Sequence, residues 1–275
     1  MSYKLFVADM DGTLLNDNKK LSDKNIQTVK KLQDFGIRFA VATGRHDSMI
    51  KSYLKHLDLQ VPVISCNGAV VREPFSDQIF LSEALPAAQS LQVIEICKER
   101  NADFHIYGHE SIIGEKLNRK MLYYHNLNQT LPPEEQTKLV KVPDCKDAVL
   151  NDSEPLYKFL IISDRNKDLL DIMDDVAKIE GLTVCQSMPK LCDVMKEGVT
   201  KAYALQKLSE SLGIKRKEIV AIGDQLNDID LIEYAGLGIA VANAEDALKE
   251  KADIVTNSTN NENAVSEAIE KYLLN

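Results

Sequence analysis

Short apolar runs alternate with amphipathic stretches near both ends of the chain, and this alternation constrains the fold more than any other feature of the sequence. Leu5–Ala8, Ile37–Ala42 and Ile219–Ile222 have the length and composition of buried strands, and the segment before Gly36 carries apolar residues at helical spacing. Strands that alternate with helices in this way form a mostly parallel sheet. We therefore predict an α/β fold with a doubly wound, Rossmann-like parallel-sheet core.

The middle of the chain has a different pattern, in which helices are mixed with more isolated strands. Helices are expected at residues 90–100 and 166–179, and strands at 104–107, 157–162, 183–187 and 191–195. We interpret this part as a second α/β domain inserted into the first. The predicted boundaries give a core of residues 1–83 and 196–275 and an inserted domain of residues 84–195.

Composition and charge exclude several classes of protein. Hydrophobic residues make up 44% of the 275 residues, which is ample for a core, and no apolar stretch is long enough to span a bilayer. The five cysteines form no C-x-x-C pair, so we expect reduced thiols. A net charge of −9 argues against nucleic-acid binding, which requires a basic surface. Since the first residues also lack a signal-peptide pattern, we expect a soluble cytoplasmic protein that binds neither nucleic acid nor membrane.

Polar residues follow the carboxyl ends of four predicted strands, the three named above and a further strand that begins at residues 62–65. They form the segments Asp9-Met10-Asp11-Gly12-Thr13, Thr43-Gly44-Arg45, Asn67-Gly68 and Gly223-Asp224, the last followed by Asn227 and Asp228. In an open parallel sheet, ligands bind in the crevice outside the carboxyl ends of the strands. The sequence therefore predicts that these segments meet in one site.

The chemistry that fits such a site is metal-assisted phosphoryl transfer. Asp9, Asp11, Asp224 and Asp228 would bring several carboxylates together, which is unfavourable without a cation. A hard divalent ion with oxygen ligands, Mg2+ above all, removes this repulsion and also binds a phosphate oxygen. Alternation along the strand end directs the side chain of Met10 into the core.

Each motif alone has a simpler explanation. The aspartates can be ordinary turn or helix-capping residues, and Thr43 an ordinary strand-end threonine. Lys201 follows Thr200, a plausible N-cap, so its charge opposes the helix dipole by roughly 0.3–1 kcal/mol. That cost is reasonable if Lys201 meets a phosphate and the aspartates beside it, whereas the alternative is a solvated surface lysine. The motifs occurring together favour the functional interpretation.

Taken in order, the motifs resemble the four motifs of the haloacid dehalogenase superfamily. The first two are Asp9-Met10-Asp11-Gly12-Thr13 and Thr43-Gly44-Arg45. The other two are Gly198-Val199-Thr200-Lys201 and Gly223-Asp224-Gln225-Leu226-Asn227-Asp228. The long insertion, preceded by Asn67-Gly68-Ala69, resembles the Cof-type sugar-phosphate phosphatases. The resemblance implies a phosphoric monoester hydrolase that acts on small phosphorylated metabolites, with the inserted domain serving as a substrate-specificity cap.

The resemblance also implies a role for each motif residue. Asp9 would be the nucleophile that forms an aspartyl-phosphate, Asp11 the general acid and base, and Thr43 and Lys201 the catalytic groups on the phosphoryl group. The implied metal site holds Mg2+ with the Asp9 carboxylate, the Asp11 backbone carbonyl and Asp224, supported by Asp228. The implied substrate- or phosphate-binding positions are Met10, Gly44, Arg45, Asn67, Gly68, Lys201 and Asn227.

Three rival functions stay open at this point. A phosphoaccepting switch similar to a response-regulator receiver shares clustered aspartates and Mg2+, but is shorter and has no such insertion. A phosphomutase of the same superfamily shares the nucleophile and the metal, and a catalytically silent binding protein could keep the fold.

His105, His109 and His125 could alternatively bind a metal, although no strand or helix phase brings the three together. Neither the individual substrate nor the oligomeric state follows from the sequence.

Overall fold

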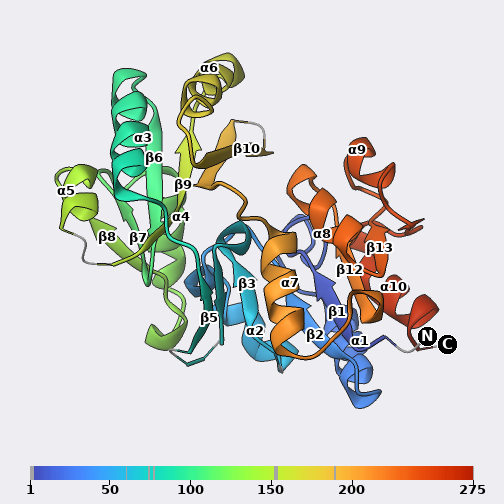
Figure 1. Cartoon of the computed structure of the whole chain (residues 1–275). Helices are drawn as coiled ribbons and strands as arrows, with labels where there is room; N and C mark the ends of the chain where they lie inside the picture. Colours follow the sequence, from blue (N-terminus) through green and yellow to red (C-terminus); the bar gives the residue numbers. More distant parts are fainter. Residues whose placement is uncertain are drawn as a thin grey trace. The chain divides into compact units, whose positions relative to one another are not determined.

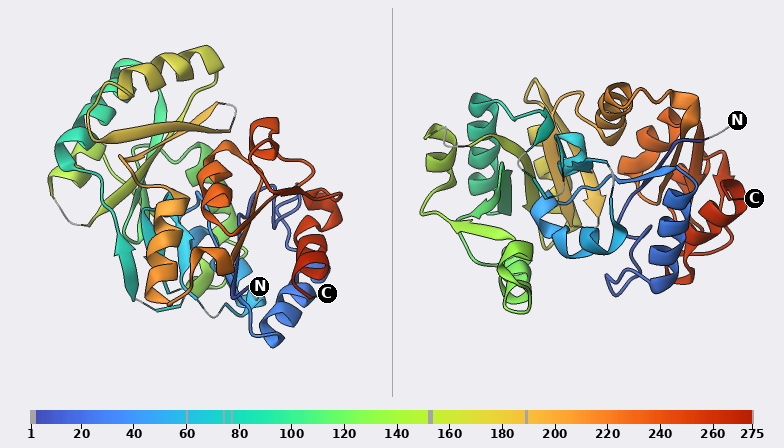
Figure 2. Two further views of the ribbon diagram at one scale, coloured as in Figure 1. Left: turned by 45° about the vertical axis from the view of Figure 1, so that its right-hand side comes forward. Right: turned by 90° about the horizontal axis from the view of Figure 1, so that it is seen from below.

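The computed structural model describes residues 3–59, 61–73, 75–76, 78–151, 154–188 and 190–274. Its ribbon is shown in Figures 1 and 2. The chain divides into two compact units. Unit 1 consists of Met1–Arg45, Ser52–Leu81 and Thr200–Asn275, and unit 2 of His46–Lys51 and Ser82–Val199.

The core of unit 1 is a five-stranded parallel sheet, which confirms the predicted fold class. The strands are β1 (Leu5–Ala8), β2 (Arg38–Val41), β12 (Ile219–Gly223), β13 (Leu237–Ala240) and β14 (Ile254–Val255), in the order β14-β13-β12-β1-β2. The central strand β1 pairs in parallel with β12 on one side and with β2 on the other. All four residues of β1 are fully buried, as expected for an apolar strand in the middle of a sheet.

Helices in unit 1 pack in pairs around this sheet. They are α1 (Asp23–Asp34), α2 (Lys51–Leu57), α7 (Lys201–Ser211), α8 (Ile229–Tyr234), α9 (Asp246–Lys249) and α10 (Ala264–Tyr272). Helix α1 contacts α10, and α7 contacts α8. The predicted N-cap of α7 is confirmed, since the Thr200 hydroxyl accepts the Tyr203 N–H at 3.1 Å. Short 3-10 turns are η1 (Asp47–Met49), η2 (Cys66–Gly68), η3 (Pro133–Glu135), η4 (Arg216–Glu218), η5 (Leu226–Asp228) and η6 (Asn260–Glu262).

A small three-stranded sheet follows β2 in the chain. Its strands β3 (Val63–Ser65), β4 (Val70–Arg72) and β5 (Ile79–Ser82) lie in that order, and β3 pairs antiparallel with β4. A single parallel bridge between Ala42 and Ile64 joins β3 to the end of β2. The segment at Val63–Ser65, predicted as a third strand, therefore belongs to a separate sheet that continues the edge of the first one.

Unit 2 is built on a six-stranded sheet of order β10-β11-β9-β6-β7-β8. The strands are β6 (Asp103–Gly108), β7 (Ser111–Gly114), β8 (Lys138–Lys141), β9 (Leu156–Ile162), β10 (Leu182–Met188) and β11 (Leu191–Lys196). The helices are α3 (Ala87–Glu99), α4 (Arg119–Asn128), α5 (Cys145–Leu150) and α6 (Asn166–Val176). All four strands expected in this region are present. The sequence analysis missed β7, β8, α4 and α5, which are too short or too weakly amphipathic to show a period.

The two faces of this sheet differ in chemistry. Phe104, Phe159, Ile161 and Val194 form the apolar core of unit 2 with buried residues of α3, α5 and α6. Side chains alternate along a strand, so their neighbours in sequence lie on the other face. Lys158 and Asp193 are therefore on the face opposite this core, and both are buried.

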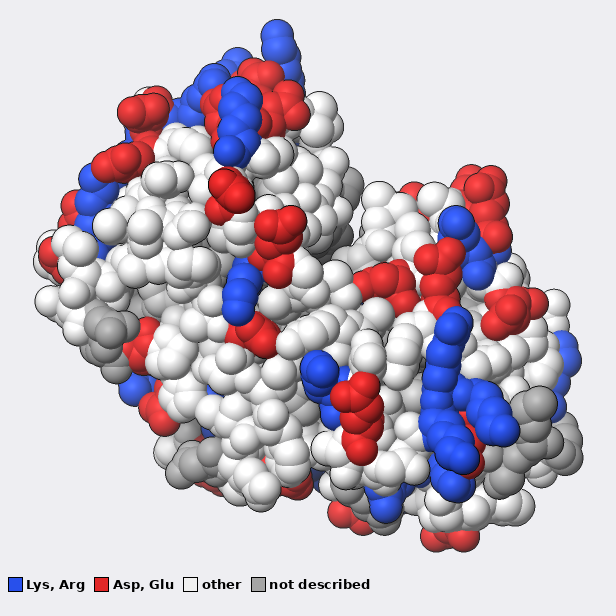
Figure 3. Space-filling model, in the orientation of Figure 1, with Lys and Arg blue, Asp and Glu red and all other residues white. Residues whose placement is uncertain are grey.

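No helix among the described residues is long and apolar enough to cross a membrane. None of the five cysteines forms a disulfide bond in the structure. Figure 3 shows acidic and basic side chains interspersed on the face in view, without a continuous basic surface there.

Candidate active site

The loop after β1 is shaped by a glycine that no other residue can replace. Gly12 has φ +86°, and a Cβ at this position would lie 2.3 Å from the Asp224 Oδ2 atom. The close approach allows the Thr13 hydroxyl to donate a hydrogen bond of 2.7 Å to Asp224 Oδ1. The side chain of Met10 is buried in the core, as strand alternation predicts, so only its backbone is available to the site.

Three predicted carboxylates meet at the ends of β1 and β12. Oxygen atoms of Asp9, Asp224 and Asp228 lie within 4.8 Å of one another, and all three side chains are buried. The Lys201 ammonium donates to Asp9 Oδ1 and to Asp228 Oδ1, each at 2.6 Å. Lys201 itself is 1% exposed, so the alternative of a solvated surface lysine is wrong. Three carboxylates and one ammonium leave an excess of two negative charges.

This excess charge shifts the acid–base equilibria of the group. Burial, together with Asp228 and Asp224, raises the pKa of Asp9 well above its usual value, although Lys201 opposes the shift. Burial and the neighbouring Asp228 raise the pKa of Asp224 to about 6. Burial alone would lower the pKa of Lys201, but Asp228 and Asp9 outweigh it and raise that pKa.

The arrangement fits a divalent cation with hard oxygen ligands. Its charge would cancel the excess of two negative charges, and carboxylates are the ligands that Mg2+ accepts. Asp228 is the least available of the three, because its Oδ1 binds Lys201 and its Oδ2 accepts the backbone N–H groups of Asp224 and Gln225, both at 3.1 Å. Its hydrogen bonds suit a residue that orients the Asp224 loop rather than a direct metal ligand.

Asp11 lies in an environment opposite to that of Asp9. Arg45 binds both of its oxygens, with Nε and one terminal nitrogen each at 2.6 Å, and the Lys19 ammonium lies 2.9 Å from Oδ1. Burial would raise the pKa of Asp11, but these two cations hold it well below its usual range. The Arg45 guanidinium lies 5.6 Å from the centre of the Tyr53 ring, and the Tyr53 hydroxyl donates to the Lys19 carbonyl at 3.0 Å.

The sequence analysis did not identify Lys19 or Tyr53. Lys19 belongs to an irregular loop and has φ +57°, so no strand or helix phase points to it. Arg45 pairs with Asp11 in this structure, and its contact with substrate stays a prediction. The three residues Lys19, Arg45 and Tyr53 together fix the Asp11 side chain.

The turn η2 holds the Thr43–Arg45 segment in place. Cys66, Asn67 and Gly68 have φ values of 50°, 55° and 99°, so three successive residues are in left-handed conformations. Each non-glycine residue in such a conformation costs on the order of 1–3 kcal/mol, which the surrounding contacts must offset. The backbone N–H of Asn67 donates to the Thr43 carbonyl at 3.0 Å, and that of Cys66 to the Arg45 carbonyl at 2.9 Å.

The Asn67 side chain ties this turn to η5. Its Oδ1 atom accepts a hydrogen bond of 3.0 Å from Asn227 Nδ2. A Cβ on Gly68 would lie 2.1 Å from the Thr200 carbonyl oxygen, so that position requires glycine, whereas a Cβ on Gly44 would lie 2.7 Å from Asn67 Oδ1 and would displace the Asn67 side chain. The buried Thr43 hydroxyl accepts the Arg45 N–H at 3.1 Å and keeps its own hydrogen for donation.

The histidines considered as an alternative metal site are not brought together. His105 Nε2 lies 3.4 Å from Asn118 Oδ1, and His109 Nδ1 lies 3.1 Å from the Tyr157 hydroxyl. Among the described residues, the group of metal-binding side chains in one place is Asp9, Asp224 and Asp228.

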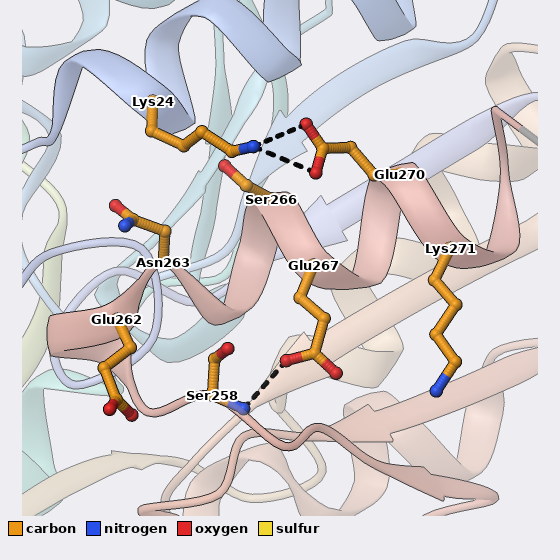
Figure 4. A pocket seen from close by; sticks show the side chains of 8 residues that line it. All are labelled: Lys24, Ser258, Glu262, Asn263, Ser266, Glu267, Glu270 and Lys271. Atoms are coloured by element: carbon orange, nitrogen blue, oxygen red, sulfur yellow. Dashed lines mark hydrogen bonds and ion pairs between the residues drawn. The ribbon is translucent and has the colours of Figure 1, made fainter.

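A surface pocket of about 340 Å3 lies elsewhere in unit 1, between the beginning of α1 and α10. Figure 4 shows Lys24 paired with Glu270 across it, at 2.7 Å and 3.0 Å, and Glu267 accepting the Ser258 N–H at 2.8 Å. None of its lining residues belongs to the predicted site. The Lys24–Glu270 ion pair joins α1 to α10 and has no evident catalytic chemistry.

Comparison with known proteins connects this geometry to a family. The sequence profile of a family described as haloacid dehalogenase-like hydrolase matches residues 6–269. The pyridoxal phosphate phosphatase YbhA of Escherichia coli (strain K12) is 28% identical over 274 residues and covers 100% of both chains. The 5-amino-6-(5-phospho-D-ribitylamino)uracil phosphatase YcsE of Bacillus subtilis (strain 168) is 30% identical over 272 residues, 98% of this chain and 96% of that protein.

Solved structures have the same fold. A haloacid dehalogenase-like hydrolase from Bacteroides thetaiotaomicron superposes with a TM-score of 0.84 at 29% identity, over 98% of this chain and 99% of that one. A second, from B. subtilis, gives a TM-score of 0.86 at 26% identity, over 98% and 100% of the two chains.

Proposed function

Because the chain belongs to the haloacid dehalogenase-like hydrolases, we propose that it is a Mg2+-dependent phosphatase of small phosphorylated metabolites that works through an aspartyl-phosphate on Asp9. The observation that carries the proposal is the buried Asp9, Asp224 and Asp228 group with Lys201 between two of its members. A structural salt bridge does not need a surplus of buried negative charge, whereas a site for a metal and a phosphoryl group does.

In the proposed reaction, the free carboxylate oxygen of Asp9 attacks phosphorus and displaces the alkoxide of the substrate. Lys201 opposes the rise in the pKa of Asp9 and aligns its carboxylate, which favours attack in line with the leaving oxygen. Bound Mg2+, held by Asp9, the Asp11 carbonyl and Asp224, would supply charge that neutralises the phosphoryl oxygens. Thr43 and Lys201 donate hydrogen bonds to the same group, and their positions are fixed before the substrate arrives.

Asp11 supplies the acid and base of the two half-reactions. As it lies here, Arg45 and Lys19 hold Asp11 ionised, and the same two cations make its carboxylate a weak base. Its carboxyl group must therefore separate from these cations before it protonates the leaving alkoxide, and equally before it accepts a proton from the water that hydrolyses the aspartyl-phosphate. Both half-reactions require a rotation of Asp11 away from Arg45 and Lys19.

Unit 2 is proposed to act as the cap that sets substrate specificity. The relatives named above act on pyridoxal phosphate and on a phosphorylated ribityl compound, which are small phosphate monoesters with different leaving groups. We extend to this chain the general class of small phosphorylated metabolites, sugar phosphates included. The free thiols fit a reducing compartment such as the cytoplasm.

The test is phosphate release from a panel of phosphorylated sugars, nucleotides and cofactors, with Mg2+ and with EDTA. We expect release that requires Mg2+ and that Asp9→Asn abolishes while the protein stays folded. Asp246→Asn, on an aspartate that is 97% exposed, is the matched control and should keep full activity. An isomerised sugar phosphate would instead indicate a phosphomutase, and an active, folded Asp9→Asn enzyme would exclude the nucleophile assignment.

A further inference from the structure

A buried polar group lies on the second face of the unit 2 sheet, outside the site described so far. The Lys158 ammonium is 3.0 Å from Asp193 Oδ1 and 4.6 Å from the centre of the Tyr107 ring. Lys158 of β9 is directly opposite Tyr107 of β6. Asp193 of β11 is opposite Leu160 of β9, two residues after Lys158. The side chains of Lys158 and Asp193 are both 3% exposed.

The fold gains little from this ion pair. Removing two charges from water costs several kcal/mol per ion, and replacing a buried pair with apolar residues of similar size is often neutral or stabilising. Phe159 and Val194, the next residues along the two strands, form the opposite face with apolar side chains alone. An ion pair kept at these two positions therefore indicates a role in binding.

The three side chains match a hydroxylated ligand. A hydroxyl group both donates and accepts hydrogen bonds, and Lys158 offers donors while Asp193 offers acceptors. The Tyr107 ring provides an apolar surface against which the C–H groups of a polyol or sugar can pack. We propose that Lys158, Asp193 and Tyr107 form a subsite that selects phosphate monoesters whose leaving group carries hydroxyls near the ester oxygen.

His46 connects this subsite to the phosphate-binding segment. Its ring stands edge-on to Tyr107, with centroids 6.2 Å apart, and its Nε2 lies 2.9 Å from the Gly108 carbonyl oxygen. His46 belongs to unit 2, whereas the preceding residue, Arg45, binds Asp11 in unit 1. One peptide bond thus links a residue that holds the acid–base group to one that holds the aromatic ring of the subsite. The inference rests on the proposed function and on unit 2 acting as its cap.

The experiment compares kcat/KM for glucose 6-phosphate and for p-nitrophenyl phosphate, whose leaving group has no hydroxyl beside the ester. The main variant is the pair Lys158→Met with Asp193→Leu, because it leaves no single charge buried and so protects the fold. Asp193→Asn, which keeps the shape of the side chain, is the conservative second variant. Lys146→Met, on a lysine of α5 that pairs with Glu95 of α3, is the matched control.

We expect the ratio of kcat/KM for the sugar ester to that for the aryl ester to fall about 10- to 100-fold in the double variant, the range for one lost hydrogen bond to a charged group. Asp193→Asn should lower the ratio less, and Lys146→Met should not change it. An unchanged ratio in a folded, active double variant would overturn the subsite, as would equal losses for both esters. A wild-type enzyme that hydrolyses neither these esters nor the wider panel would instead remove the proposed function, and the subsite with it.

Discussion

Among the described residues, Lys201 in unit 1 and Lys158 in unit 2 are deeply buried, and the two lysines have different surroundings. Lys201 of unit 1 lies between two carboxylates with a third nearby, and the group keeps an excess of negative charge. Lys158 of unit 2 pairs with the Asp193 carboxylate and lies over the Tyr107 ring, so the charges of this ion pair balance. Unbalanced charge requires a further cation and shifts the pKa values of its members, whereas a balanced pair can bind a neutral ligand. The comparison contrasts the site proposed for catalysis with the subsite proposed for substrate recognition.

The largest difference is expected in catalysis. Lys201→Met removes the ammonium that neutralises Asp9 and Asp228, so kcat/KM should fall by about 10²–10³-fold for every ester. Initial rates over the ester panel at saturating Mg2+ measure this. A loss that varies strongly from one leaving group to another would contradict the assignment of Lys201 to the phosphoryl group.

Removing one member of the Lys158–Asp193 pair should destabilise the protein more than removing both. Lys158→Met alone leaves Asp193 buried without its cation and should lower the free energy of unfolding by about 3–5 kcal/mol, most of which the added Asp193→Leu restores. Urea titrations in EDTA measure both variants. If the double variant were no more stable than the single one, the charges of Lys158 and Asp193 would not balance each other as the comparison requires.

Mg2+ should stabilise the protein through the Asp9, Asp224 and Asp228 group and not through the Lys158–Asp193 pair. At a Mg2+ concentration about 100 times Kd, binding adds about 2.7 kcal/mol to the free energy of unfolding. Asp224→Asn should abolish this gain, because it removes a proposed ligand, and the Lys158→Met and Asp193→Leu double variant should keep it. Thermal melts with and without Mg2+ decide the point; equal gains in Asp224→Asn and wild type would place the metal elsewhere.

The metal effect should depend on pH through Asp224. Burial raises the pKa of this carboxyl to about 6 in the folded state, above its usual value of 3.8. Its protonated form therefore favours the folded state below pH 3.8, and without metal that contribution is lost as the pH rises to about 6. Protons compete with Mg2+ at Asp224 and also at Asp9, whose pKa is likewise raised, so the Mg2+-induced gain should shrink as the pH falls through about 6. Asp224→Asn should lack this metal-free slope in denaturant titrations across the same pH range.

The smallest effect concerns the ring beside Lys158. A double-mutant cycle of Tyr107→Leu and Lys158→Met should give a coupling of about 0.5–2 kcal/mol in the free energy of unfolding, the range for a cation over an aromatic face. Tyr107→Phe, which keeps the ring, should retain most of the coupling. A coupling near zero would mean that the ring contributes to packing only.

Much of the fold and the centre of the site could be predicted from the sequence. Family membership, the phosphatase class and the parallel-sheet core are confirmed. Asp9 and Asp224 were expected to meet because each follows a buried strand, and parallel strands end at the same edge of a sheet. Lys201 was placed beside the aspartates by its unfavourable position in the first turn of a helix, and it contacts two of them.

The features that could not be predicted lie in irregular segments, which have no helical or strand periodicity in the sequence. The pairing of Asp11 with Arg45 and Lys19 is set by an irregular loop, where spacing along the chain does not determine direction. The left-handed conformation of Cys66 also has no sequence signal, since cysteine rarely adopts it, whereas the next two residues, Asn67-Gly68, are a common turn dipeptide. Lys158, in contrast, is the only charged residue in the buried strand Leu156–Ile162, and that interruption of an apolar run was a usable signal.

The strand order of unit 1 has a consequence for synthesis on the ribosome. The central strand β1 needs β12 on one side, and Leu5 cannot meet Ile219 until most of the chain has been translated. Residues 82–199 of unit 2 form one continuous segment that can collapse before β12 emerges. One edge of β1 therefore stays unpaired until β12 has been synthesised. The entropy lost in closing the long loop between the two strands slows their pairing. A chaperone that shields exposed strand edges would be most useful to this protein during that interval.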